Sequence, residues 1–160
     1  MAIDGVKIID SDQAYDIYNE VVGRYRDGEQ VANIIKDILD TEKDDCQTDF
    51  FTEIYWTAFA YSLWKIGHLT DDIRDKTLEI IKKGPDPFWL EIDSNALKQR
   101  QKVLEKLAVQ LQTENPRPLK VPKAKAKRKP YFEEGDILAV KFEDEYGLVF
   151  VSMVEQSPRK

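Results

Sequence analysis

The chain has 160 residues, of which 42% are apolar and 34% are charged, and its formal net charge is −6. This length suits one domain of ordinary size, or a domain with a small appendage, and the apolar fraction is enough for a core. No apolar run approaches the roughly 18 residues that span a bilayer, the N-terminus lacks a signal-peptide pattern, and one cysteine excludes an intrachain disulfide. We therefore expect a cytoplasmic protein with no membrane partner.

The charges fall into three blocks of alternating sign. Residues 1–114 carry a net charge of −9, residues 115–130 carry +7 without a single acid, and residues 131–160 carry −4. Each change of sign coincides with a change in the hydrophobic pattern. We therefore divide the chain into a helical bundle domain over residues 1–113, a basic Pro/Lys-rich linker over 114–130, and a β-hairpin segment over 131–160.

The first 49 residues have the pattern of two amphipathic helices and an acidic loop. Asp10 or Ser11 can cap the first helix, Gly28 ends it, and a second, shorter helix follows. Apolar residues recur at helical spacing in both helices: Ala14, Ile17, Tyr18, Val21, Val22 and Tyr25, then Val31, Ile34, Ile35, Ile38 and Leu39. The predicted loop contains Asp40, Glu42, Asp44, Asp45 and Asp49.

Residues 50–66 form the predicted core helix. Apolar and aromatic residues surround nearly its whole circumference, which is typical of a helix buried among its neighbours. Trp56 and Trp64 lie eight positions apart on one broad side of this helix, and we expect them to belong to the core rather than to a ligand cage. Gly67 ends the helix.

Two further helices complete a predicted five-helix bundle. Thr70 can cap the fourth helix, and Gly84-Pro85 ends it. Residues 85–90 are then expected to form a turn whose aromatic side chains cover one end of the core. Ser94 can cap the last helix, in which Leu97, Leu104, Leu107, Ala108 and Leu111 form a narrow stripe, so this helix should pack on the outside.

The end of the chain changes to a β pattern. Four prolines and seven like charges predict an extended linker. Beyond Gly135-Asp136, two β-rich runs at residues 137–142 and 146–154 flank the polar turn at residues 143–145. The fold class is therefore mainly α, with a short C-terminal β-hairpin or partial SH3-like element.

The residues that carry chemistry give no recognisable catalytic or metal constellation. Asp40, Glu42 and Asp44 have the first spacings of an EF-hand, but the glycine and bidentate-glutamate positions of that loop are not matched. Cys46 has acidic neighbours, and the only histidine is His68. We expect no enzyme, no cofactor and no metal. The alternative is an enzyme with an unrecognised pair of carboxylates.

The basic linker supports a second alternative, a nucleic-acid-associated protein. Positive side chains can neutralise phosphates and release counterions. The residues that would do so are Lys123, Lys125, Lys127, Arg128 and Lys129. The linker lacks interleaved aromatic residues for base stacking, and both of its flanks are acidic. A solvated spacer explains the same composition, so nucleic acid is the less favoured partner.

The β segment is the favoured place for function. Two strands are only marginally stable in water. Thirty residues of this kind must therefore dock on the helical bundle, pair with a second copy or with another protein, or belong to a longer chain. We expect the segment to mediate association with another protein or with a second copy of the chain, which would make an oligomer. The predicted partner-binding residues are Ile137, Leu138, Val140, Phe142, Tyr146, Leu148 and Phe150.

Several core and turn motifs resemble those of a group of small bacterial proteins of uncharacterised function. The motifs are the block at residues 55–60, the block at residues 63–69, residues 78–81, Gly84 and Trp89. In that group a helical region precedes a basic linker and a Gly-Asp β domain, and the β domain resembles immunity-type domains of toxin–immunity systems. The resemblance covers residues 10–111 and 131–154. It implies a non-catalytic interaction protein that neutralises a toxin by binding it, and it supplies no catalytic residue.

Overall fold

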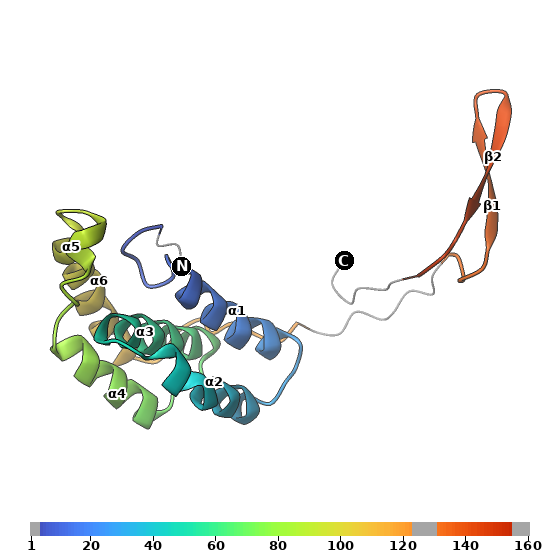
Figure 1. Cartoon of the computed structure of the whole chain (residues 1–160). Coiled ribbons are helices and arrows are strands. Elements are labelled where there is room, and N and C mark those ends of the chain that lie inside the picture. The colour runs from blue at the N-terminus through green and yellow to red at the C-terminus, as the bar shows by residue number, and fades with distance from the viewer. Residues whose placement is uncertain (1–3, 123–130, 155–160) are drawn as a thin grey trace. The chain divides into compact units, whose positions relative to one another are not determined.

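A computed structural model of the chain describes residues 4–122 and 131–154, and these two stretches belong to two separate compact units. The first unit is helical and the second is a two-stranded antiparallel sheet, so the mainly α fold class with a C-terminal hairpin is confirmed (Figure 1). The helices are α1 (Asp12–Arg26), α2 (Val31–Asp45), α3 (Asp49–Ile66), α4 (Asp71–Lys82), α5 (Trp89–Ile92) and α6 (Ala96–Leu111).

Helix α3 is the centre of the helical unit, as its apolar circumference predicts. Twelve of its eighteen residues are buried, and it contacts α1, α2, α4 and α6. Thr48 caps its N-terminus by accepting a hydrogen bond from the backbone N–H of Phe51. Gly67 follows its last turn in the left-handed conformation, with φ of 77°. The local sequence therefore fixes both ends of the central helix.

The helices around α3 alternate in direction. Tyr18 lies near Tyr61, and Tyr25 lies near His68, so α1 and α3 run the same way. Helix α6 also runs parallel to α3, because its residue Arg100 contacts Glu53, and Thr113, just beyond its end, contacts Trp64. Helices α2 and α4 run opposite to α3. The short connections before and after these two helices allow only antiparallel neighbours.

Two predictions about the bundle are wrong in detail. The predicted acidic loop is helical as far as Asp45, so α2 has 15 residues and equals α1 in length. The Gln13 side chain donates a hydrogen bond to the Asp45 carbonyl, and the Tyr55 hydroxyl donates one to the Ile38 carbonyl. The Gln13 contact satisfies a carbonyl that the end of α2 leaves free, and the Tyr55 contact ties the middle of α2 to α3.

The number of helices and the last cap also differ from the prediction. There are six helices in the described residues rather than five, because the predicted turn ends in the four-residue helix α5, whose Trp89 is buried. Helix α6 begins after Asn95 instead of Ser94. The Asp93 carboxylate accepts a hydrogen bond from the Asn95 N–H at 2.7 Å, and this turn delays the start of the helix.

Residues 113–119, most of which we assigned to the linker, contact the C-terminal end of α3. The indole of Trp64 donates a hydrogen bond to the Thr113 carbonyl at 2.7 Å. The Asn115 amide donates to the Trp64 and Lys65 carbonyls, and the Leu119 N–H donates to the Lys65 carbonyl at 2.9 Å. Asn115 and Leu119 thereby satisfy the Lys65 carbonyl, which the helix end leaves free, and Asn115 adds a second donor to the Trp64 carbonyl.

The second unit is a hairpin of β1 (Ile137–Phe142) and β2 (Glu145–Phe150). Its register places Ile137 opposite Phe150 and Phe142 opposite Glu145, with a two-residue turn between the strands. The second strand is shorter than the predicted run to residue 154. At the base of the hairpin, Gly135 has φ of 93°, and both Gly135 and Asp136 face Val151, which is the pattern of a glycine β-bulge.

The close packing of Gly67 against Pro118, in the segment that follows α6, can be tested by one substitution. A Cβ at Gly67 would lie 2.8 Å from the Pro118 Cβ, and the residue has a positive φ. Gly67→Ala should therefore lower the free energy of unfolding by about 1–2 kcal/mol or more in urea titrations followed by circular dichroism.

The matched control for this substitution is Gly23→Ala in α1. No atom lies within 4 Å of a Cβ built at Gly23, and its backbone is helical. This variant should raise the free energy of unfolding by up to about 1 kcal/mol, because alanine is the better helix former. Equal effects of the two substitutions would contradict the role assigned to Gly67.

Candidate functional site

A buried ion pair connects the central helix to the rest of the helical unit. Glu53 on α3 and Arg100 on α6 are 2% and 1% exposed, and the Arg100 Nε donates to the Glu53 Oε1 at 2.7 Å. Burial lowers the pKa of the Arg100 guanidinium, while the Glu53 carboxylate acts against that change. A charge in such a place requires a full set of partners.

Both terminal nitrogens of Arg100 also have hydrogen-bond partners. Its terminal nitrogens donate to the carbonyls of Val6 and Lys7 and to the Thr57 hydroxyl, at 2.8–3.2 Å. The guanidinium carbon lies 4.7 Å from the centre of the Trp89 ring. One side chain of α6 therefore binds the N-terminal segment, α3 and α5 together.

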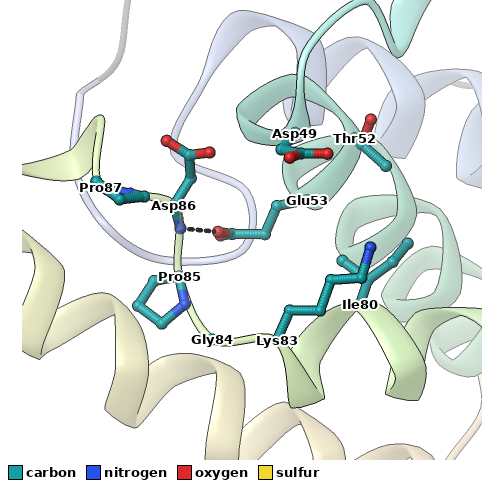
Figure 2. A pocket seen from close by; sticks show the side chains of 9 residues that line it. All are labelled: Asp49, Thr52, Glu53, Ile80, Lys83, Gly84, Pro85, Asp86 and Pro87. Carbon is teal, nitrogen blue, oxygen red and sulfur yellow. Dashed lines mark hydrogen bonds between the residues drawn. The ribbon is translucent and has the colours of Figure 1, made fainter.

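A small cavity lies beside Glu53. It has a volume of about 170 Å³, and Figure 2 shows Asp49, Thr52, Lys83, Gly84 and Asp86 among the residues that line it. The Glu53 Oε2 accepts a hydrogen bond from the Asp86 N–H at 2.9 Å, and both of its oxygens lie within 3.4 Å of the Trp89 indole nitrogen. The Asp86 carboxylate points away from Glu53 and accepts from the Phe88 N–H at 2.8 Å.

This geometry gives the carboxylates structural partners. Each oxygen of Glu53 accepts from at least two donors, and the Asp86 oxygen stabilises a turn, so the two groups are not aimed at a common point in the cavity. Within the described ranges, no three His, Cys, Asp or Glu side chains are placed to hold a metal ion. The absence of an enzyme activity stays a prediction.

The structure keeps Cys46 and His68 apart. Cys46 precedes the N-terminus of α3 and His68 follows its C-terminus, and the 18-residue helix between them is about 27 Å long. Burial raises the pKa of the Cys46 thiol to about 11, with smaller contributions in the same direction from Glu42 and Asp45. The two side chains therefore cannot form a nucleophile–base pair.

The hairpin has two chemically different faces. Because side chains alternate along a strand, the register places Ile137, Ala139, Lys141, Tyr146, Leu148 and Phe150 on one side, called the Leu148 face. The opposite side, called the Val140 face, consists of Leu138, Val140, Phe142, Glu145, Gly147 and Val149. Each face has one charged residue, located near the turn.

The seven predicted partner-binding residues therefore divide into two groups. Ile137, Tyr146, Leu148 and Phe150 share the Leu148 face and are 68%, 70%, 79% and 64% exposed. Leu138, Val140 and Phe142 lie on the Val140 face, where the first two are only partly exposed. On that face the Phe142 ring lies over Gly147, since a Cβ at Gly147 would be 3.2 Å from Cε2 of Phe142.

Acidic residues lie at both ends of the apolar hairpin. Glu133, Glu134 and Asp136 precede β1, and Glu143, Asp144 and Glu145 surround the turn. Lys141 is the single base in residues 131–154, so this stretch has a net charge of −5. Exposed apolar side chains between two acidic ends form the most distinctive surface in the described part of the chain.

Several residues of these sites were missed in the sequence. Arg100 falls at a core position of its helix, between Ala96 and Leu104, but it was not among the residues of the predicted stripe. Glu53 is likewise the one acid within the apolar stretch at residues 50–64 of α3. On the hairpin, Val149 and Met153 are 45% and 64% exposed and were not in the predicted set. A single charged residue inside an apolar stripe, present in both helices, is the sequence pattern that could have predicted the ion pair.

The predicted nucleic-acid-binding residues Lys123, Lys125, Lys127, Arg128 and Lys129 lie outside the described residues. Among the residues that are described, no helix combines the length and apolarity needed to cross a membrane. Comparison of the chain with protein-family models, with curated proteins and with solved structures gives no match.

We expect the buried ion pair to be strongly cooperative. Arg100→Met and Glu53→Leu should each lower the free energy of unfolding by about 3–5 kcal/mol, because each leaves a buried charge without its partner. The double variant should lose clearly less than the sum of the two, as measured by urea unfolding.

A half-buried arginine at the surface provides the control for this cycle. Arg74 on α4 pairs with Asp71 and Asp75 at the surface. Arg74→Met should leave the unfolding midpoint almost unchanged, because exposed pairs contribute little. Additive losses at Glu53 and Arg100 would contradict the coupling.

The Cys46 thiol should alkylate slowly in the folded protein. With its pKa raised to about 11 by burial, it is deprotonated only at higher pH than a free thiol. At pH 8 its thiolate fraction should be roughly a hundred-fold below that of the urea-unfolded chain, since each pKa unit is a factor of ten. Iodoacetamide labelling followed by mass spectrometry measures this, and a rate that levels off below pH 10 would contradict it.

Proposed function

We propose that this chain is a non-catalytic protein-interaction module whose hairpin binds another protein. The observation that supports the proposal is the Leu148 face, on which four large apolar side chains are each more than 60% exposed. Exposed clusters of this kind on small elements mark interaction sites in soluble proteins. The helical unit, with its own buried core, serves as the scaffold.

The charge of the hairpin defines the chemistry of the partner. An apolar centre with acidic groups at both ends fits a protein surface that has an apolar patch and basic residues around it. Such complementarity raises the association rate and disfavours acidic competitors. A basic toxin, such as a nuclease, has this character, and the chain would then act as an immunity-like protein that neutralises the toxin by occupying its surface.

The arrangement of the carboxylates also favours binding over catalysis. Glu53, the buried acid of the described residues, is engaged by Arg100, by Trp89 and by a backbone N–H. A general acid or base needs a free position for the proton that it transfers. The buried polar cluster is therefore better suited to holding the scaffold together.

Substitution of Leu148, the most exposed of the large apolar residues in the two strands, tests the proposed function. The immobilised full chain captures proteins from cells of its source, and each captured protein is then produced alone and titrated by calorimetry. Leu148→Lys should weaken binding at least ten-fold, because truncation or charging of a central apolar contact has effects of that size. Binding of the unaltered chain should also weaken as salt is raised.

Val109→Lys is the matched control for this experiment. Val109 lies on α6 and is 68% exposed, against 79% for Leu148, so the substitution introduces the same charge in place of another well-exposed apolar side chain. This variant should bind like the unaltered chain. Equal binding by the Leu148→Lys variant, or a captured protein that is itself acidic, would count against the proposal.

A further inference from the structure

The outer edge of β2 consists of three residues whose backbone groups face away from β1. At the base of the hairpin, the Val151 N–H donates to the Asp136 carbonyl at 2.9 Å. Hydrogen-bonded and non-hydrogen-bonded pairs alternate along an antiparallel ladder, so the register makes 138–149, 140–147 and 142–145 the bonded pairs. The backbone groups of Tyr146, Leu148 and Phe150 therefore point outward.

The two edges of the hairpin differ in charge. The outward residues of β1 are Ile137, Ala139 and Lys141, and those of β2 are Tyr146, Leu148 and Phe150. Natural edge strands avoid pairing with other chains by carrying charged residues, lysine above all. Edge β1 has such a residue and edge β2 has none, which makes β2 the edge that is open to a further strand.

The sequence of β2 is self-complementary when two copies of the strand pair in antiparallel orientation. With Leu148 opposite Leu148 of a second copy, Tyr146 faces Phe150 and Gly147 faces Val149. The acidic residues Glu145 and Asp144 then face Val151 and Ser152, so no like charges are opposed. Aromatic cross-strand pairs of this kind contribute stability, and opposed like charges would reduce it.

We propose that two copies of the chain join through their β2 edges around a two-fold axis at Leu148. The product is a four-stranded antiparallel sheet in the order β1–β2–β2–β1. Three or more strands with an apolar face are what an independently stable sheet requires, and an isolated hairpin lacks them. A two-fold contact uses the same residues on both copies and closes on itself, which limits the assembly to a dimer.

The dimer would join the two Leu148 faces into one apolar surface. Because the outward backbone groups belong to the residues of that face, edge pairing places Tyr146, Leu148 and Phe150 of both copies side by side. This part of the inference rests on the proposed function, since the joined face is the surface offered to the basic partner. The dimer itself is formed without the partner and is measured without it.

A pair of proline variants of the full chain tests which edge is used. Leu148→Pro and Ala139→Pro each remove one outward N–H while keeping the hydrogen bonds between β1 and β2. Sedimentation equilibrium of the unaltered chain at micromolar concentration should give twice the chain mass of 18.6 kDa. The Leu148→Pro variant should give the single mass, and the Ala139→Pro variant should retain the doubled mass.

A disulfide trap gives a second measurement that does not depend on a disruptive variant. In the Cys46→Ser background, Leu148→Cys should cross-link two copies within minutes of mild oxidation, because the axis brings the two residues within disulfide reach. Ala139→Cys, on the far edge, should cross-link at least ten-fold more slowly. Three results would each overturn the proposal. The unaltered chain could be a monomer, the two cysteine variants could cross-link equally fast, or the dimer could be lost only in the Ala139→Pro variant.

The two proposals fail separately in these experiments. A monomeric chain whose Leu148→Lys variant loses a basic partner would overturn the edge pairing and leave the proposed function standing. A stable dimer whose Leu148→Lys variant binds the protein partners as well as the unaltered chain would overturn the proposed function and leave the edge pairing standing.

Discussion

The helical unit depends on a carboxylate and a guanidinium that are buried inside its core. Glu53 on the central helix is paired with Arg100 on α6, and the guanidinium also binds carbonyls of the N-terminal segment and the Thr57 hydroxyl. Burying either charge alone would be unfavourable, so the two helices and the segment before α1 must come together for the core to form. This pair couples the ends of the unit, whereas apolar packing acts mainly between neighbouring helices.

The hairpin has the opposite problem, because it has apolar side chains on both faces and only two strands to bury them. Its turn, its register and its glycine bulge are all set locally, so the element has a defined shape. What it lacks is a covering surface, and more than half of the area of Ile137, Tyr146, Leu148 and Phe150 is accessible. Pairing with a second copy would cover the β2 edge, and a basic partner would cover the apolar side chains of the Leu148 face.

The predictions from sequence succeeded where one periodic signal decides the structure. Residues 50–66 are apolar on nearly all sides, and α3 is buried on nearly all sides. The alternating runs around residues 143–145 form the predicted hairpin. The predictions were wrong where a distant residue decides the outcome: Gln13 bonds the end of α2, which continues through the expected loop, and Glu53 pairs with Arg100 inside the core.

The sequence by itself determined the order of the elements, the central helix, the hairpin and the division of charge into three blocks. These follow from local periodicity, from glycine and proline positions and from composition, none of which requires a partner. Only the tertiary structure decided that Arg100 is internal, that residues 113–119 lie on the end of α3, and that the seven hairpin residues form two faces. These depend on which groups meet across the chain, because a buried charge or a strand face is defined by its neighbours and not by its own residue type.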